Sequence, residues 1–91
     1  MAFEWDEAKR RKNLAKHGVD FADSVEEFDW HEAYIGIDDR VDYGEVRLFA
    51  LGWFRNRVHH VTFTARGSNT RIISFRKASR QEVRVYEEEK N

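Results

Sequence analysis

Two tight-turn signals divide the middle of the chain into three strand-like segments, and this pattern limits the fold more than any other feature. Glu45–Phe54 leads through the dipeptide Arg55-Asn56 into Arg57–Ala65, and a second turn at Arg66–Asn69 leads into Thr70–Lys77. Asparagine tolerates the positive φ that a two-residue hairpin turn requires. We therefore expect these segments to form an antiparallel meander with helices packed against one face.

A helix is predicted to precede the meander. Asp6 has the character of an N-cap, the stretch up to His17 has good helix propensity, and Gly18 suits the left-handed position that ends many helices. Apolar side chains are few here, so the helix is expected to cover the edge of a core and to expose a basic face. These apolar residues are Ala8, Leu14 and Ala15.

Three shorter elements complete the prediction. Asp20 would cap a second helix that extends to about Phe28, and Ala33–Ile37 is a short segment typical of a strand. Ser79 and Glu82 have capping-box spacing, which predicts that a final helix begins there. The expected fold is therefore α+β, with two N-terminal helices, a four-stranded and largely antiparallel sheet, and a C-terminal helix.

The size and composition of the chain agree with one small domain over residues 1–91. There is no cysteine, which excludes disulfides and thiolate metal sites. No apolar run is long enough to span a membrane, and no signal-peptide pattern is present. We therefore expect a cytoplasmic protein without a membrane contact.

Charge is strongly segregated along the chain. Residues 9–17 carry five Lys or Arg and no acid, while Asp20–Glu45 carries ten acids against one base. From Val46 to Tyr86 there are nine bases against one acid. Such blocks can form a basic surface for a polyanion beside an acidic surface for a basic partner. Alternatively, folding mixes the blocks into surface ion pairs, each worth less than about 1 kcal/mol.

Alternation along the strands sorts their side chains by face. The set expected beneath the helices is Val46, Leu48, Ala50, Val61, Phe63, Ala65, Ile73 and Phe75. The opposite face would gather Glu45, Arg47, His60, Thr62, Thr64, Arg66, Ser74 and Arg76, together with Phe49, Leu51, Trp53 and Ile72. A one-residue bulge would exchange the faces locally. Several arginines beside one acid and one histidine indicate a surface suited to phosphate.

Three stretches resemble the BrnT family of toxins: FEWDEAKRRKNLAKHGVDFADS, DDRVDYGEVRLFALG and VTFTARGSNTRIISFRKASRQE. The resemblance implies a ribonuclease with a RelE-like fold that arrests growth until a BrnA-like antitoxin covers it. It also implies a complex of two toxins with two antitoxins, which represses the shared operon through the DNA-binding domain of the antitoxin. RNA would be the substrate, and operator DNA would be contacted only indirectly.

A ribonuclease without a metal needs a base for the 2′-hydroxyl, cations for the phosphorane and an acid for the leaving oxygen. We expect Arg66 and Arg76 to stabilise the phosphorane. The residues expected to bind RNA or to assist are Arg47, Arg71, Lys77, Lys9, Lys16 and His17. The candidates for proton transfer are Glu45, His60, His17 and Tyr86. No cofactor and no metal site are expected, because spacings typical of metal ligands are absent.

Each candidate also has a structural explanation. Glu45 can pair with an arginine, His17 can stabilise a helix C-terminus, and Tyr86 can be a packing residue. His59 and His60 are adjacent, so only one of them can face the site. The alternatives to a ribonuclease are a non-catalytic module that binds an antitoxin or nucleic acid, a general polyanion-binding protein, and a magnesium site among the acids of residues 38–42.

Overall fold

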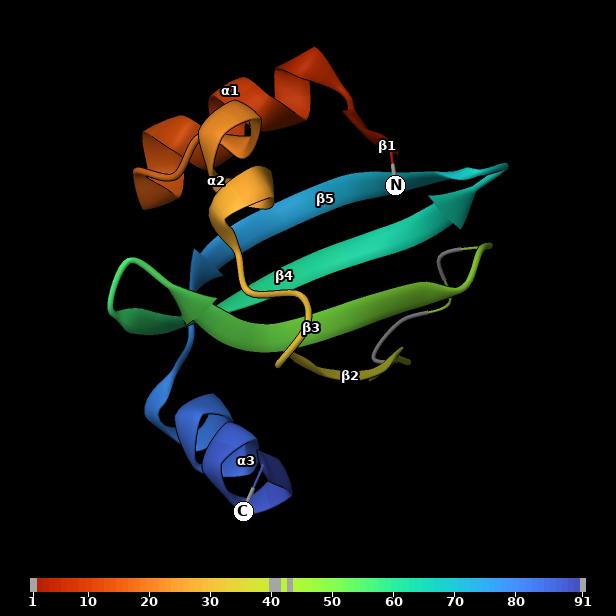
Figure 1. The fold of residues 1–91 in the computed structure, drawn as a ribbon. Helices are drawn as coiled ribbons and strands as arrows, with labels where there is room; N and C mark the ends of the chain where they lie inside the picture. The colour runs from red at the N-terminus through yellow and green to blue at the C-terminus, as the bar shows by residue number, and fades with distance from the viewer. Residues whose placement is uncertain (1, 40–41, 43, 91) are drawn as a thin grey trace.

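The computed structural model describes residues 2–39, 42 and 44–90, and it has an α+β fold (Figure 1). Within these residues, five strands form a single sheet, and three helices pack on it. The elements in chain order are β1 (Ala2–Trp5), α1 (Glu7–His17), α2 (Phe21–Glu27), β2 (Tyr34–Asp38), β3 (Arg47–Phe54), β4 (Arg57–Arg66), β5 (Asn69–Lys77) and α3 (Arg80–Lys90).

The strand order in the sheet is β1-β5-β4-β3-β2. The predicted antiparallel meander is confirmed for β2 to β5, and both residues of the Arg55-Asn56 turn have positive φ, at 47° and 67°. The prediction of four strands is wrong, because β1 adds a fifth that runs parallel to β5. Phe3 pairs with Thr70 across most of the chain length, and such a non-local pairing leaves no turn signal in the sequence.

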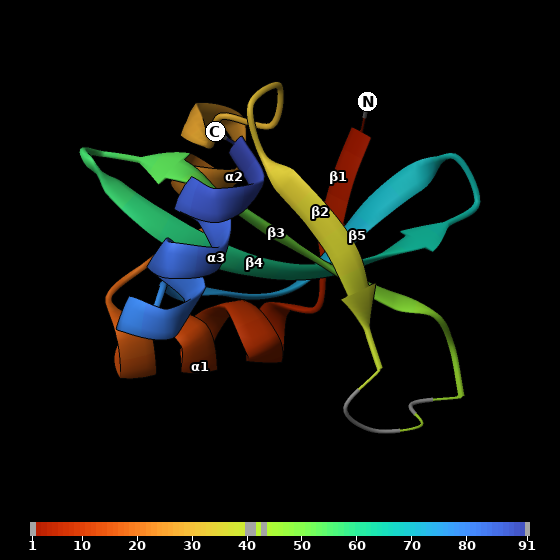
Figure 2. The same ribbon diagram turned by 90° about the horizontal axis from the view of Figure 1, so that it is seen from below.

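The helices lie on both faces of the sheet, which corrects the expectation that they pack against one face. Figures 1 and 2 show α1 and α2 on one side and α3 on the other, where α3 contacts β3 and β2. The predicted caps are confirmed: the Asp6 carboxylate accepts from the backbone N–H of Ala8 and Lys9, and Gly18 adopts φ 71°. Among the described residues, none of the helices is long and apolar enough to cross a membrane.

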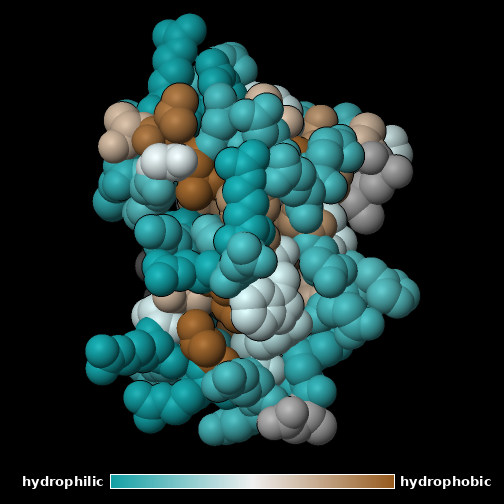
Figure 3. All heavy atoms as spheres, turned by 60° about the vertical axis from the view of Figure 1, so that its left-hand side comes forward, coloured by the Kyte–Doolittle hydropathy of each residue, from teal (hydrophilic) through white to brown (hydrophobic). Residues whose placement is uncertain are grey.

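Among the described residues, two apolar clusters hold α2 and α3 to the sheet. The larger lies on the α2 side, where Phe21, Val25 and Phe28 pack with strand residues such as Phe75. The smaller lies under α3 and consists of Leu51, Val58 and Tyr86 with their neighbours. Away from these clusters, Figure 3 shows a largely hydrophilic face on which hydrophobic side chains form small, separate patches.

A bulge between Thr62 and Phe63 changes the predicted face assignment in β5. Ile72 pairs with Phe63 and is completely buried under α1 and α2, although alternation had placed it on the opposite face. Ile73 was expected in that core but is only partly buried. Val46, also predicted to be beneath the helices, is 68% exposed because the helices do not extend over the start of β3.

The contact of α1 with the sheet is polar, which corrects the prediction of an apolar one. Ala8, Leu14 and Ala15 are all exposed. Asn13 is buried instead, and its side-chain amide donates to the carbonyl of Phe75 at 2.8 Å while its oxygen accepts from the Phe75 N–H at 3.1 Å. Because β1 pairs with β5 only as far as Ile72, Asn13 continues the hydrogen bonding along that edge.

Candidate active site

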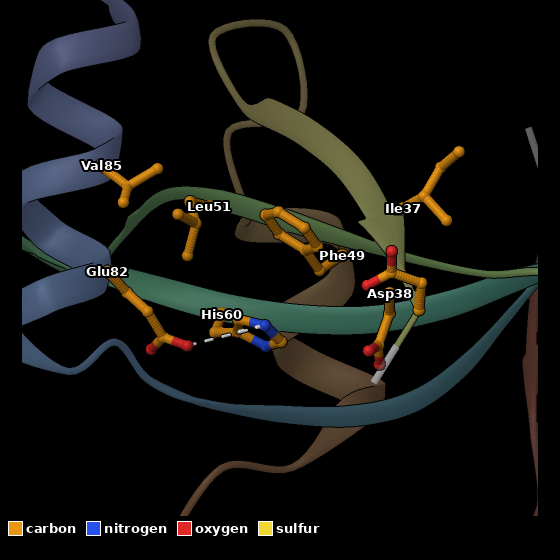
Figure 4. Close-up of a pocket in the computed structure, with 8 residues that line it drawn as sticks. Ile37, Asp38, Phe49, Leu51, His60, Glu82 and Val85 are labelled. Atoms are coloured by element: carbon orange, nitrogen blue, oxygen red, sulfur yellow. Dashed lines mark ion pairs between the residues drawn. The ribbon is translucent and has the colours of Figure 1, made fainter. Parts of the chain in front are cut away.

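A hollow of about 230 Å³ lies between α3 and the sheet face beneath it (Figure 4). Its base comes from β3 and β4, one wall from α3, and the other from the end of β2. The lining residues are Ile37, Asp38, Asp39, Phe49, Leu51, His60, Glu82 and Val85. In Figure 4 the Asp38 carboxylate and the His60 ring are directed into this space, whereas Ile37 is directed away from it.

His60, Glu82 and Arg76 form a connected cluster at one end of the hollow. The Arg76 guanidinium donates to both oxygens of Glu82, at 2.8 and 3.0 Å. The Nε2 atom of His60 lies 3.8 Å from the same carboxylate, which is ion-pair range and too long for a hydrogen bond. The sheet brings His60 and Arg76 together as register partners on β4 and β5, and the first turn of α3 adds Glu82.

Glu82 is held as a carboxylate. Burial by itself would raise its pKa, but hydrogen bonds from Arg76 and from the Ser79 N–H, with the positive charge of His60 and Arg76, lower the pKa to about 2. The Ser79 N–H donates to the Glu82 carboxylate and the Glu82 N–H donates to the Ser79 hydroxyl, so the predicted capping box is formed. Glu82 therefore holds both the first turn of α3 and the Arg76 guanidinium in place, next to the His60 ring.

The His60 ring is fixed by stacking. It lies on Phe49 with ring centroids 5.5 Å apart and planes 11° from parallel. Phe49 in turn covers Gly36 of β2, where a Cβ atom would come within 2.6 Å of the phenyl ring. A side chain at position 36 would therefore displace Phe49, and glycine is required for this ring arrangement.

The two adjacent histidines lie on opposite faces, as alternation requires. His59 is buried on the α1 and α2 side, where its ring packs edge-on to Phe54 and its Nδ1 contacts the Arg57 carbonyl. Burial lowers the pKa of His59, partly offset by that hydrogen bond. Of the pair, only His60 lines the hollow beneath α3.

A basic stripe follows one side of α1. Lys9, Lys12, Lys16 and His17 border a shallow depression together with Ile73 and Ser74. Burial and the positive charges of Lys16 and Arg76 lower the pKa of His17. The stripe thus lies close to the Arg76 end of the cluster, although its residues come from the other end of the chain.

The remaining predicted arginines lie in two other places. Arg66 is 4.0 Å from Glu45, which also accepts from Arg47, so these three form a second cluster at the far end of β3 and β4. Arg66 lies six residues beyond His60 on β4, a separation of about 20 Å along an extended strand. The structure therefore does not bring Arg66 and Arg76 to one point.

Three further residues predicted for the site either make structural contacts or lie away from the hollow. Arg71 is paired with Glu4 of β1, across the parallel strand pair. Lys77 is exposed and lies beside His17 and His59 on the α1 side. Tyr86 is buried in the α3 cluster, and its hydroxyl donates to the Glu32 carbonyl at 3.4 Å, which is the environment of a packing residue.

Sequence reasoning missed two functional candidates. Glu82 was predicted only as a helix cap, although it follows Arg76 by six residues across a strand-to-helix turn. Lys12 was omitted, although it completes the helical spacing of Lys9 and Lys16. Within residues 2–39, 42 and 44–90, no three His, Asp or Glu side chains come together in a geometry suited to a metal ion.

Comparison with known families identifies the chain. No individually curated protein matches it. However, the sequence profile of the family described as "Ribonuclease toxin, BrnT, of type II toxin-antitoxin system" matches residues 5–82. That span covers α1, α2, strands β2 to β5 and the start of α3, including every residue that lines the hollow except Val85, so the chain belongs to the BrnT family of ribonuclease toxins.

Proposed function

We propose that the protein is an endoribonuclease toxin that cleaves RNA without a metal ion, at the hollow beneath α3. The observation that supports this most is the His60–Glu82–Arg76 cluster, which places a proton-transfer group, a carboxylate and a guanidinium together in a chain of a ribonuclease family. RNA cleavage through the 2′-hydroxyl requires a proton acceptor and a cation at one phosphate.

In this mechanism His60 takes the proton of the 2′-hydroxyl as its oxygen bonds to phosphorus, and then gives a proton to the 5′-oxygen as the P–O5′ bond breaks, which leaves a 2′,3′-cyclic phosphate. The ring lines the hollow, stacking on Phe49 fixes its plane, and the Glu82 carboxylate beside Nε2 stabilises the imidazolium that forms when the ring takes a proton. Arg76 supplies positive charge toward the phosphorane, while Glu82 holds its guanidinium in place.

The α1 stripe would hold the RNA backbone as it approaches. Its Lys9, Lys12 and Lys16 side chains are exposed and border a depression that reaches Ser74, two residues before Arg76 on β5, so phosphates along them would lead toward the cluster. Arg66 and Arg47 would form a second RNA-binding site about 20 Å further along β4, away from the phosphate that is cleaved.

The test is RNA cleavage by purified protein in excess EDTA. His60→Gln and Arg76→Lys should each lower kcat at least about 100-fold, because proton transfer contributes typically 10²–10⁴-fold and lysine lacks the guanidinium fork. Arg66→Ala should mainly raise KM. His31→Gln, at an exposed histidine, is the matched control and should leave cleavage unchanged.

Two results would reject this mechanism. One is cleavage that disappears in EDTA and returns with magnesium, which would require a metal. The other is full activity of folded His60→Gln, with folding checked by circular dichroism and a thermal melt.

A second candidate is a non-catalytic module that binds an antitoxin or nucleic acid. One observation favours it: the Arg76 guanidinium already donates hydrogen bonds to Glu82 and to the Lys77 carbonyl. A residue whose role is to anchor α3 to the sheet would have the same contacts. Harmless expression of the chain alone, with RNA intact in the cells, would support this module over the ribonuclease.

The remaining parts of the proposal follow from the family. We expect a RelE-like fold and a BrnA-like antitoxin in a complex of two toxins and two antitoxins. That complex would repress its operon through the antitoxin, in the bacterial cytoplasm. Mass measurement of the co-expressed complex tests the stoichiometry directly.

A further inference from the structure

The strand β2 ends the sheet on the side opposite to β1. Its inner side pairs with β3 along its whole length, from Tyr34 with Leu51 to Asp38 with Arg47. Its outer side pairs with no strand in the part of the chain that the structure describes. A strand edge of this kind presents backbone N–H and C=O groups on which another chain can form a further strand.

Apolar side chains are exposed along the same edge. Ile35 is 48% exposed and Ile37 is 66% exposed, and Val46 nearby is 68% exposed. All three side chains belong to the same face of the sheet as α1 and α2. Those helices lie over the β5 end of that face and leave the β2 end uncovered (Figure 1). An edge strand normally avoids exposed aliphatic pairs, since they favour association, so this edge has the character of an interface.

The charge around β2 selects the kind of partner. Asp38 and Asp39 lie at the end of the strand, and with Asp42 and Glu45 they form an acidic segment beside Ile37 and Val46, in which Arg47 is the one base that lines the same depression. A second copy of the chain would bring an identical acidic segment against this one. A basic segment would instead be attracted to it, because complementary charges favour encounter and like charges oppose it.

We propose that the free edge of β2 binds an extended basic segment of the antitoxin, which adds to the sheet as a sixth strand. This inference rests on the proposed toxin function, because that function supplies the partner. Alternation fixes the pattern of the segment: apolar residues on the face of Ile35 and Ile37, and Lys or Arg on the face of Asp38.

The position of this edge would also explain inhibition. Ile37, Asp38 and Asp39 line the hollow that contains His60 and Glu82 (Figure 4). A strand added along β2 would therefore pass the mouth of the hollow, and its basic side chains would occupy the approach that RNA needs. Binding and inhibition would then be one event.

The first experiment measures the affinity of the purified chain for the antitoxin encoded beside it, by calorimetry. Ile35→Lys should weaken binding about tenfold to 100-fold, because it removes an apolar contact and repels a basic segment. Leu14→Lys is the matched control, since Leu14 is 41% exposed on α1, and it should bind as the unaltered chain does. RNA cleavage by Ile35→Lys should be unchanged.

The second experiment uses two nine-residue peptides, one alternating Val and Lys and the other alternating Val and Glu. The basic peptide should bind, protect the β2 amides from hydrogen exchange and slow RNA cleavage, whereas the acidic peptide should do none of these.

Three outcomes would overturn the inference: Ile35→Lys binding as tightly as the unaltered chain, equal binding of both peptides, or a dimer of the chain alone that Ile35→Lys dissociates. A chain that binds the antitoxin at β2 but cleaves no RNA would instead reject the proposed function and leave this interface standing.

Discussion

At the scale of single residues, Glu82 links stability to the candidate chemistry. It caps α3, holds Arg76 with two hydrogen bonds and lies beside His60. A carboxylate with these partners stabilises the fold only while it is ionised. The same side chain therefore orders the site and makes the stability of the protein depend on pH.

We predict that Glu82→Gln lowers the free energy of unfolding at pH 7 by about 2–3 kcal/mol, since one pKa unit corresponds to 1.36 kcal/mol and the group is partly solvated. The folded pKa of about 2 lies below the usual 4.5, so this stability is present above pH 4.5 and is lost as pH falls toward 2. Denaturant unfolding of the unaltered chain and of Glu82→Gln at pH 7 and pH 3 measures this difference in the free energy of unfolding.

The matched control is Glu87→Gln, at an exposed position on α3. It should change the free energy of unfolding by less than about 0.5 kcal/mol. Equal stabilities of Glu82→Gln and the unaltered chain at pH 7 would show that the pairing with Arg76 contributes nothing.

At the scale of elements, α1 is attached by a polar contact rather than an apolar stripe. Asn13→Ala should lower the free energy of unfolding by about 2–4 kcal/mol, because it leaves the buried N–H and C=O of Phe75 without their partner. Lys12→Ala, at the neighbouring exposed position, should be close to neutral. Thermal melts compare the two, and similar melting temperatures would contradict this account of α1.

Local sequence signals predicted most of the elements but not their full assembly. Caps at Asp6, Asp20 and Ser79 and the Arg55-Asn56 turn are decided by neighbouring residues, so they were predictable. The pairing of β1 with β5 depends on residues far apart in the chain. The bulge after Thr62 lets Ile72 pair with Phe63 and pack in the core. Strict alternation of side chains along a strand cannot predict where such a bulge lies.

For the candidate site, the sequence predicted which side chains share a face of the sheet, but not where along the sheet they lie. Alternation correctly placed His60 and Arg76 on one face, because both lie in regular strands on one side of the bulge. It could not show how far along the sheet each arginine lies, and so it grouped Arg66 with Arg76. Glu82 comes next to His60 and Arg76 because the chain turns from β5 into α3. Alternation along strands predicts nothing about residues beyond that turn.

At the scale of the whole molecule, folding pairs part of the charge blocks with one another, as in Arg10–Asp20 and Arg55–Glu27, and leaves two charged surfaces apart. The α1 stripe lies beside β5, and the acids Asp38, Asp39, Asp42 and Glu45 lie together near the end of β2, at the other side of the sheet. Replacing Lys9, Lys12 and Lys16 together by Gln should raise KM for RNA and leave kcat nearly unchanged. The slope of log affinity against log salt should fall by about 2, since each phosphate contact contributes about 0.7 for a single strand.

The control for this charge variant is Glu87→Gln combined with Glu88→Gln, which changes charge on α3 away from the stripe. An unchanged salt slope in the lysine variant would show that RNA does not follow α1.

Cleavage through the 2′-hydroxyl at the His60–Glu82–Arg76 cluster would leave its mark on the chemistry of the new RNA ends. After digestion in excess EDTA, we expect 5′-hydroxyl ends, which a kinase labels without prior phosphatase treatment, and 2′,3′-cyclic or 3′-phosphate ends. Folded His60→Gln should produce almost none of them. Fragments with 5′-phosphate ends, or products formed equally by His60→Gln, would contradict the account.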